Sequence, residues 1–251
     1  MKEIPHLIHY CWFGGKPLPP LADKCIKSWQ KFLPDYKIIR WDETNFPVNE
    51  IPFIEAAYQA GKYAFVSDYA RLKILHEYGG LYFDTDVEII RPIDDIIAAG
   101  PFMGCENESR LGERPESLGV NPGLGFGAYP DMELLEELTR LYLSMTFDPH
   151  DSNPLTIVEH TSRALTEHGL KNTPEIQSVA GFNIYPKEYF APLSPSLIMH
   201  LTPQSRTIHH YAATWKSRGS KMKNTLKRLI GPRLTELLLP SLSAIKRSVF
   251  R

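Results

Sequence analysis

Residues 67–90 read SDYARLKILHEYGGLYFDTDVEII, and the order of features in this stretch predicts how the domain is built. Apolar residues recur at helical spacing as far as Tyr78, and Gly79 and Gly80 are typical of a helix end. The run LYFDTD at 81–86 has the composition of a buried strand. A helix that leads through two glycines into a strand is typical of layered α/β domains.

Asp84 and Asp86 are separated by one residue at the end of this predicted strand. Residues two apart in a strand point to the same side, so both carboxylates can face one hard cation at the carboxyl end of the strand, where open α/β sheets bind ligands. With 11 Asp in 251 residues, about half a D-x-D motif is expected by chance. The spacing alone therefore favours a cation site and a solvated strand end about equally.

The predicted helix carries two charged residues on or beside its apolar face. Asp68 lies in the middle of that face and Arg71 borders it. An isolated buried charge costs several kcal/mol, so these groups must be paired or take part in binding. They are either a structural i, i+3 ion pair, or they face a polar cleft where Arg71 contacts a ligand and Asp68 holds sugar hydroxyls. The apolar face itself comprises Phe65, Leu72, Leu75 and Tyr78.

Short strand-like runs alternate with longer helical runs along the rest of the chain, which predicts an α/β fold with a mixed sheet flanked by helices. The chain shows no internal repeat and no linker before residue 215, so residues 1–215 are expected to form one domain. Strands are expected at residues 6–13, 36–41, 101–106, 123–129 and 205–211, and helices at 21–33, 53–60, 133–143 and 156–168.

Composition excludes several classes of protein. A hydrophobic content of 43% is enough for a sizeable core, so disorder is not expected. Cys11, Cys25 and Cys105 form no C-x-x-C pair, which argues against a disulfide framework or a structural zinc site and favours the cytoplasm. The first ten residues lack the apolar region of a signal peptide, and no apolar run approaches the length of a membrane span.

Residues 216–251 differ in charge from the rest of the chain. They hold 10 of the 28 Lys and Arg residues and only one of the 29 Asp and Glu residues, which leaves a tail of +9 and a body of about −10. Leu and Ile alternate with the basic residues at near-helical spacing. The segment predicts a basic amphipathic tail that lies on an anionic membrane or packs on the domain as a short helix; the acidic body argues against nucleic acid.

The order of motifs along the chain resembles the family-32 glycosyltransferases, a capsular-polysaccharide and mannosyltransferase-like group with a DXD sugar-binding region. The central block, S-D-x-x-R followed by G-G and D-x-D at fixed intervals, is far more specific than D-x-D alone. The motifs that carry the resemblance are HYCWFGG at 9–15, residues 63–89, VNPGLGFGAYP at 120–130, IYPKEYFAP at 184–192 and IHHYAATW at 208–215.

The resemblance implies a GT-A fold, a Rossmann-like nucleotide-diphospho-sugar transferase domain that uses Mn²⁺ or Mg²⁺. It implies a retaining transfer of a hexose or N-acetylhexosamine, from a UDP-sugar by preference, to a glycan or lipid-linked acceptor. Such an enzyme would build a surface polysaccharide or glycolipid at the cytoplasmic face of the membrane, as a peripheral protein. The base and sugar of the donor stay open, as do the acceptor and the oligomeric state.

Matched position by position, the resemblance also assigns roles. Asp84 and Asp86 look like the metal-binding DXD pair, of which Asp84 also contacts the nucleotide. The final strand places His209 and His210 on opposite faces, so only one of them can be a metal ligand, and His210 occupies the matching position. The remaining matches are Asp68, Arg71 and Asn121 near the reaction centre, Ser67 and Tyr82 at the nucleotide, Trp12 on its base, and Trp215 as a loop residue that closes over the donor.

Two alternative functions remain at this stage. YFDTDVE resembles the opening of a haloacid-dehalogenase-type phosphatase, but that motif belongs on the first strand and needs a distant acidic pair, whereas Asp94 and Asp95 follow closely here. The chain can also be a noncatalytic sugar-nucleotide-binding subunit. The chain contains the complete set of expected charged residues, which argues against a noncatalytic role. This set is Asp68, Arg71, Asp84, Asp86 and His210.

Overall fold

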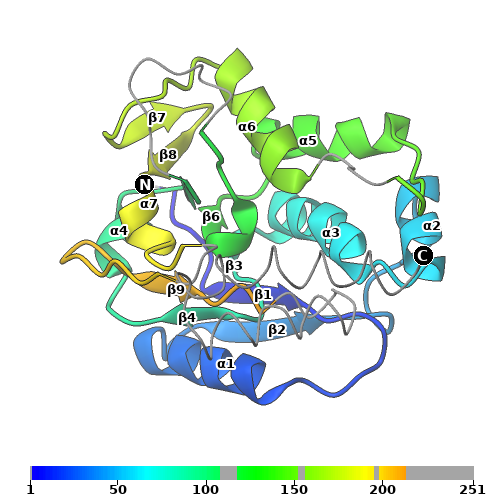
Figure 1. The fold of residues 1–251 in the computed structure, drawn as a ribbon, viewed down its shortest axis with the longest axis horizontal. Coiled ribbons are helices and arrows are strands. Elements are labelled where there is room, and N and C mark those ends of the chain that lie inside the picture. Colours follow the sequence, from blue (N-terminus) through cyan, green and yellow to red (C-terminus); the bar gives the residue numbers. More distant parts are fainter. Residues whose placement is uncertain (1, 108–117, 152–155, 195–197, 213–251) are drawn as a thin grey trace, which may run out of the picture.

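A computed structural model describes residues 2–107, 118–151, 156–194 and 198–212, and shows a three-layer α/β domain (Figure 1). Its main sheet has seven strands in the order β2-β1-β3-β6-β5-β8-β7. β1 pairs in parallel with β2 and β3, while β6 is antiparallel to both β3 and β5. A second sheet pairs β4 with β9. The predicted mixed sheet flanked by helices is confirmed.

The elements have the following bounds in the described residues. The strands are β1 (Leu7–Cys11), β2 (Lys37–Trp41), β3 (Gly80–Tyr82), β4 (Val87–Ile89), β5 (Phe102–Gly104), β6 (Phe126–Ala128), β7 (Gln177–Val179), β8 (Phe182–Tyr185) and β9 (Thr207–His209). The helices are α1 (Pro20–Phe32), α2 (Pro52–Gln59), α3 (Tyr63–Tyr78), α4 (Asp94–Ala98), α5 (Glu133–Ser144), α6 (Ile157–Glu167) and α7 (Lys187–Phe190), with a 3₁₀ turn η2 at Pro122–Leu124. None of these helices is long and apolar enough to cross a membrane.

The two faces of the main sheet bury different sets of side chains because neighbouring residues in a strand point to opposite sides. In β3, Leu81 packs with α1 and β4, whereas Tyr82 packs with α3 and α5. Trp29 anchors the first of these layers, since its fully buried indole donates a hydrogen bond of 2.7 Å to the carbonyl of Val87. The sheet is therefore held between two cores.

The stretch at residues 67–90 departs from the prediction at its two ends. The helix α3 begins at Tyr63, earlier than expected, and Tyr78 at its end is exposed rather than part of the core. The strand β3 ends at Tyr82, because the next segment turns: the amide of Asp84 donates to the carbonyl of Gly123, and the amide of Val87 donates to Asp84. Asp84 and Asp86 thus lie in the connection between two sheets, and the predicted strand alternation does not position them.

His9 joins β1 to the end of α3. Its ring is fully buried, accepts a hydrogen bond at Nδ1 from Trp41 and donates from Nε2 to the carbonyl of Gly79 at 3.1 Å. Both ring nitrogens are thus satisfied by the neutral tautomer. Burial, partly opposed by the Gly79 carbonyl, lowers the pKa of His9 from 6.5 to about 4.

This buried histidine predicts a pH-dependent stability. Between pH 6.5 and about 4 only the unfolded chain takes up a proton at His9, so its contribution is complete above 6.5 and is lost as the pH falls toward 4. At 1.36 kcal/mol per pKa unit, the advantage of the wild type over His9→Gln should shrink by about 3 kcal/mol from pH 7 to pH 4. Urea unfolding of both chains across this range measures it; a difference independent of pH would contradict the assignment.

Candidate functional site

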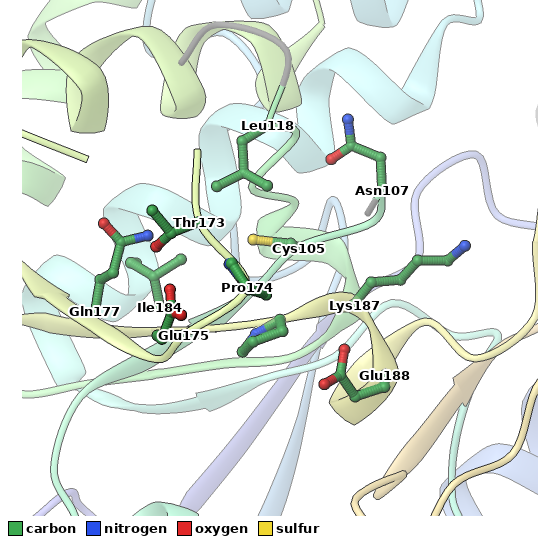
Figure 2. A pocket seen from close by; sticks show the side chains of 11 residues that line it. Cys105, Asn107, Leu118, Thr173, Pro174, Glu175, Gln177, Ile184, Lys187 and Glu188 are labelled. Carbon is green, nitrogen blue, oxygen red and sulfur yellow. The ribbon is translucent and has the colours of Figure 1, made fainter. Parts of the chain in front are cut away.

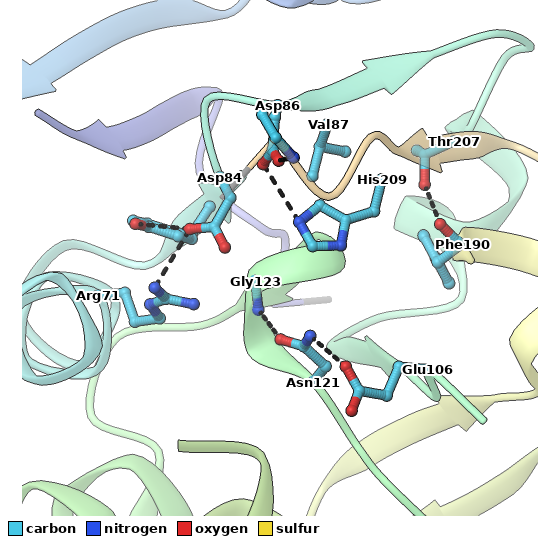
Figure 3. Close-up of polar contacts among 12 residues, drawn as sticks. Arg71, Asp84, Asp86, Val87, Glu106, Asn121, Gly123, Phe190, Thr207 and His209 are labelled. Atoms are coloured by element: carbon cyan, nitrogen blue, oxygen red, sulfur yellow. Dashed lines mark hydrogen bonds and ion pairs between the residues drawn. The ribbon is translucent and has the colours of Figure 1, made fainter. Parts of the chain in front are cut away.

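The candidate site lies where several segments meet at the carboxyl edge of β3 (Figure 3). The connection after β3 supplies Asp84 and Asp86, α3 supplies Asp68 and Arg71, and the end of β9 supplies a histidine. The turn η2 approaches from the other side, with Asn121 capping it. Residues from the middle and the end of the described chain are thus brought to one place.

Asp84, Asp86 and His209 form a group that can hold a metal ion. One ligand atom from each lies within 4.8 Å of the others. His209 Nε2 is 3.2 Å from Asp86 Oδ1, and the second oxygen of Asp86 accepts a hydrogen bond of 2.7 Å from the amide of Ala212. Two carboxylates and one imidazole form a donor set that suits Mn²⁺, so the residues present fit the expected cation.

The structure replaces His210 with His209 in this set, which corrects the prediction. β9 pairs with β4 so that His209 lies opposite Val87 and faces the two aspartates. The side chain of His210 points the other way, and its Nε2 lies 2.8 Å from Glu88 Oε2. Alternation along the strand was correctly expected to separate the two rings, but the wrong one was chosen.

The three groups differ in charge because their surroundings differ. Burial, together with the nearby carboxylate of Asp86, raises the pKa of Asp84 above its usual value despite the closeness of Arg71. Burial also opposes ionisation of Asp86, but His209 and the amide of Ala212 outweigh it, and the pKa of Asp86 is lowered. The pKa of His209 is raised because the two aspartates outweigh its burial. A cation bound here would take the place of the proton on His209.

Arg71 links the helix to the aspartates. Its guanidinium is 2.9 Å from Asp68 and 3.2 Å from Asp84, and its Nε donates to the carbonyl of Ser67. It also lies over the ring of Tyr82, 4.9 Å from the centroid, and the hydroxyl of Tyr82 donates to Asp84. Arg71 is only 4% exposed. The structural ion pair considered from the sequence is therefore present and includes Asp84 as well, whereas contact of Arg71 with a ligand stays a prediction.

Asp68 and Ser67 lie beside Arg71 on α3. Burial raises the pKa of Asp68 to about 6, although Arg71 opposes the shift. The hydroxyl of Ser67 donates to the carbonyl of Tyr63 one turn earlier in α3, so this side chain turns along its own helix. The carboxylate of Asp68 is thus paired with Arg71, and its raised pKa means that a small change of surroundings can alter its protonation.

Asn121 connects the aspartates to a carboxylate on the far side. Its Oδ1 accepts from the amide of Gly123 at 2.7 Å, and its Nδ2 donates to Glu106 Oε2 at 2.8 Å. Gly123 has no room for a side chain, since a Cβ there would lie 2.2 Å from Asp84 Oδ2 and 2.9 Å from Arg71 Nη1. The backbone of η2 is therefore packed directly against the charged groups.

Gly123→Ala is accordingly expected to displace the carboxylate of Asp84 and to lower the rate of transfer about 100-fold, since shifts near 1 Å at a reaction centre cost that much. Steady-state kinetics with the donor saturating measure it. Gly61→Ala is the control: Gly61 has a φ of +68° with no atom within 4 Å of an added Cβ, so this change strains the backbone away from the site. Equal activity of Gly123→Ala and wild type would refute the packing argument.

Two predicted residues are not joined to this cluster by a described contact. Trp12 follows β1 at the same edge of the sheet, half-buried, with its indole donating to the carbonyl of Lys16. Trp215 lies outside the described residues, as does the tail at 216–251. The roles of Trp12 and Trp215 stay predictions.

Sequence reasoning missed two residues of the cluster and named His209 only as the alternative to His210. Gly123 stood unremarked in the quoted motif at 120–130. Glu106 carries no local signal, because only the fold brings it to Asn121. Within the described chain, His209 Nδ1 and the hydroxyl of Tyr211 are buried without a hydrogen-bond partner.

Comparisons with known proteins agree with this geometry in the central part of the chain. Residues 19–103, about a third of the chain, match the family model described as "Glycosyltransferase sugar-binding region containing DXD motif". The match includes α3, both aspartates and Arg71. The chain therefore contains this region, and its resemblance to DXD-containing glycosyltransferases is confirmed; the assignment to family 32 stays a prediction.

Two curated relatives come from Schizosaccharomyces pombe (strain 972 / ATCC 24843). The chain is 30% identical over 98 residues to inositol phosphoceramide mannosyltransferase 3, covering 38% of this chain and 27% of the relative. It is 28% identical over 114 residues to inositol phosphoceramide mannosyltransferase 1, covering 41% of this chain and 34% of the relative. The chain thus matches about a third or less of the length of these relatives.

Two solved structures resemble the chain at low identity. The PaToxG glycosyltransferase has a TM-score of 0.49 and 17% identity, with 66% of this chain and 70% of that chain covered. A glycosyltransferase involved in the glycosylation of the major capsid of PBCV-1 has a TM-score of 0.41 and 13% identity, with 88% and 98% covered.

Proposed function

We propose that the chain is a metal-dependent glycosyltransferase of the GT-A type that moves a sugar from a nucleotide-diphosphate sugar to a hydroxyl acceptor. The observation that carries the proposal is the convergence of Asp84, Asp86 and His209 beside a buried Arg71, of which the two aspartates and Arg71 lie in the region that matches a DXD sugar-binding model. A UDP-sugar, retention of configuration, and an acceptor in a surface polysaccharide or glycolipid belong to the proposal as well.

The residues of the site fit the demands of this reaction. Asp84, Asp86 and His209 would hold Mn²⁺ or Mg²⁺, which neutralises charge on the departing diphosphate when bound. Arg71 is fixed by Asp68 and Asp84, so its guanidinium needs no reorganisation to face an anionic donor. Asp68, which is 9% exposed, is placed to accept hydrogen bonds from sugar hydroxyls. No protein group is assigned as the general base.

A thermal-shift panel tests the proposal directly. UDP, GDP, ADP and CDP are each added with and without Mn²⁺ to the full chain and to Asp84→Ala/Asp86→Ala. Binding at 100 times Kd stabilises the folded state by about 2.7 kcal/mol, which corresponds to a rise of about 5 °C or more in the midpoint. The expected result is a rise with one nucleotide that requires both Mn²⁺ and the aspartates. No rise with any nucleotide would refute the donor site.

The same panel separates an enzyme from a noncatalytic binding subunit. An enzyme releases nucleotide diphosphate from the matching nucleotide sugar and transfers the sugar when an acceptor is present. A binding subunit shows the thermal shift without turnover. Proton NMR of the transfer product gives the anomeric configuration of the new glycosidic bond, and comparison with the donor tests retention.

The proposal also includes where in the cell the enzyme acts. A cytoplasmic enzyme that acts on a lipid-linked acceptor would use the +9 charge of residues 216–251 to stay at an anionic membrane surface. Co-sedimentation with vesicles that contain 30% phosphatidylserine compares the full chain with residues 1–215. Equal sedimentation of both chains would contradict this role of the tail.

A further inference from the structure

A pocket of about 200 Å³ lies beside the candidate site, between the end of β5 and the segment that leads into β7 (Figure 2). Cys105 and Asn107 form one side of the pocket, and Thr173 and Glu175 form another. Lys187 and Glu188, at the start of α7, lie at its rim. The metal and donor residues described above contribute nothing to its lining.

The segment at residues 105–107 is a wall shared by the pocket and the site. Cys105 and Asn107 line the pocket, whereas Glu106 between them binds the side chain of Asn121 at 2.8 Å. Asn121 in turn holds Gly123, whose backbone contacts Asp84. The pocket is thus connected to Asp84 by a chain of contacts from Glu106 through Asn121 to Gly123.

The lining of the pocket fits a neutral sugar. Thr173 offers a hydroxyl group, and the carboxylates of Glu175 and Glu188 can accept hydrogen bonds from hydroxyl pairs. Leu118, Pro174 and Ile184 supply an apolar floor for the C–H face of a ring. Two carboxylates against one Lys187 disfavour an anionic ligand such as a phosphate.

The size of the pocket limits what it holds. Drug-sized ligands occupy pockets of roughly 300–1,000 Å³, so a pocket of about 200 Å³ fits a single sugar ring. Because the wall at 105–107 separates it from Asp84 and Asp86, the ring that it holds is not the one that reacts. It is a neighbouring ring of the same acceptor.

We infer that this pocket is an acceptor subsite that binds one neutral sugar ring of an oligosaccharide, next to the ring that receives the transferred sugar. The inference rests on the proposed glycosyltransferase function and deepens it by giving the acceptor a chemical class. It predicts that acceptors with two or more neutral sugars bind better than single sugars, because a second ring adds the contacts of the pocket to those of the reacting ring.

Two variants of the full chain test the inference. Glu175→Trp fills the pocket from an exposed rim position, and Glu188→Gln removes one acceptor of hydroxyl hydrogen bonds. Glu55→Trp is the matched control, since Glu55 is an exposed glutamate on α2, at the other end of the molecule (Figure 1). The probes are methyl glycosides of mannose, glucose, galactose and N-acetylglucosamine and their neutral disaccharides.

Saturation-transfer NMR with nucleotide diphosphate and Mg²⁺ present gives the binding, and initial rates give KM and kcat. The expected result is that at least one disaccharide binds about tenfold more tightly than its single sugars, and that Glu175→Trp removes this advantage. Glu188→Gln should weaken it severalfold, and Glu55→Trp should keep it. The nucleotide thermal shift should be unchanged in all three variants.

The outcomes separate the subsite from the function on which it rests. Disaccharide binding that Glu175→Trp leaves unchanged overturns the subsite, and so does a wild type that binds nucleotide but gains nothing from the second sugar. Loss of the nucleotide shift in the wild type overturns the proposed function instead.

Discussion

Asp86→Asn is expected to lower sugar transfer about 1,000-fold while the chain stays folded. The substitution keeps an oxygen that can accept from the amide of Ala212 but removes the charge beside His209. A cation that stabilises the transition state contributes several kcal/mol, and about 4 kcal/mol corresponds to 1,000-fold. Initial rates at several Mn²⁺ concentrations measure the effect.

The two neighbouring histidines provide the control for this prediction. His209→Ala removes a member of the ligand group and should reduce the Mn²⁺-dependent nucleotide shift as strongly as Asp86→Asn. His210→Ala removes the contact of this ring with Glu88, on the other side of β9, and should keep transfer within about twofold of wild type. A larger loss in His210→Ala than in His209→Ala would restore the original choice of ligand.

Arg71→Met is expected to destabilise the fold by about 3–5 kcal/mol, because it leaves Asp68 and Asp84 without their buried positive partner. The methionine retains much of the apolar volume, so the loss reports the charges and not a cavity. Urea unfolding measures it.

Measuring the stability loss of Arg71→Met at two pH values provides an internal control. Without Arg71, which opposes the raised pKa of Asp68, this pKa rises further, so the variant should be less destabilised at pH 5 than at pH 8, where Asp68 must ionise. Adding Asp68→Asn should recover part of the loss at pH 8 and little at pH 5. A loss that is equal at both pH values would show that packing, not charge, makes Arg71 important.

Most of the fold could be predicted from the sequence, because the strongest patterns in the sequence are local. The helices α1 and α5 lie within two residues of their predicted ranges, since their periodicity and proline or polar ends are explicit. The short elements α4, α7, β7 and β8 were not predicted, because three to five residues carry no readable period. The turn after Tyr82 was missed for a different reason: it depends on a hydrogen bond from Asp84 to Gly123, about forty residues away in the chain.

The residues of the candidate site also fall into two groups: those that a local stretch of sequence predicts and those that depend on contacts made by the fold. Asp68, Arg71, Asp84 and Tyr82 were chosen from one continuous stretch, and the structure brings them into direct contact. The choice between His209 and His210 depends on which face of β9 meets β4, which only the pairing decides. Glu106 enters the cluster through a contact between side chains that no spacing in the sequence encodes.

The pairing of β9 with β4 has a consequence for how the protein is made. The third ligand of the candidate cation site, His209, comes from the last strand of the described chain, whereas both aspartates precede residue 90. During synthesis the seven strands of the main sheet leave the ribosome before β9 does. β4 cannot pair until β9, more than a hundred residues later in the chain, has been made. The main sheet can therefore assemble before His209 joins the two aspartates, so a metal that needs all three groups would be bound only after β9 has paired with β4.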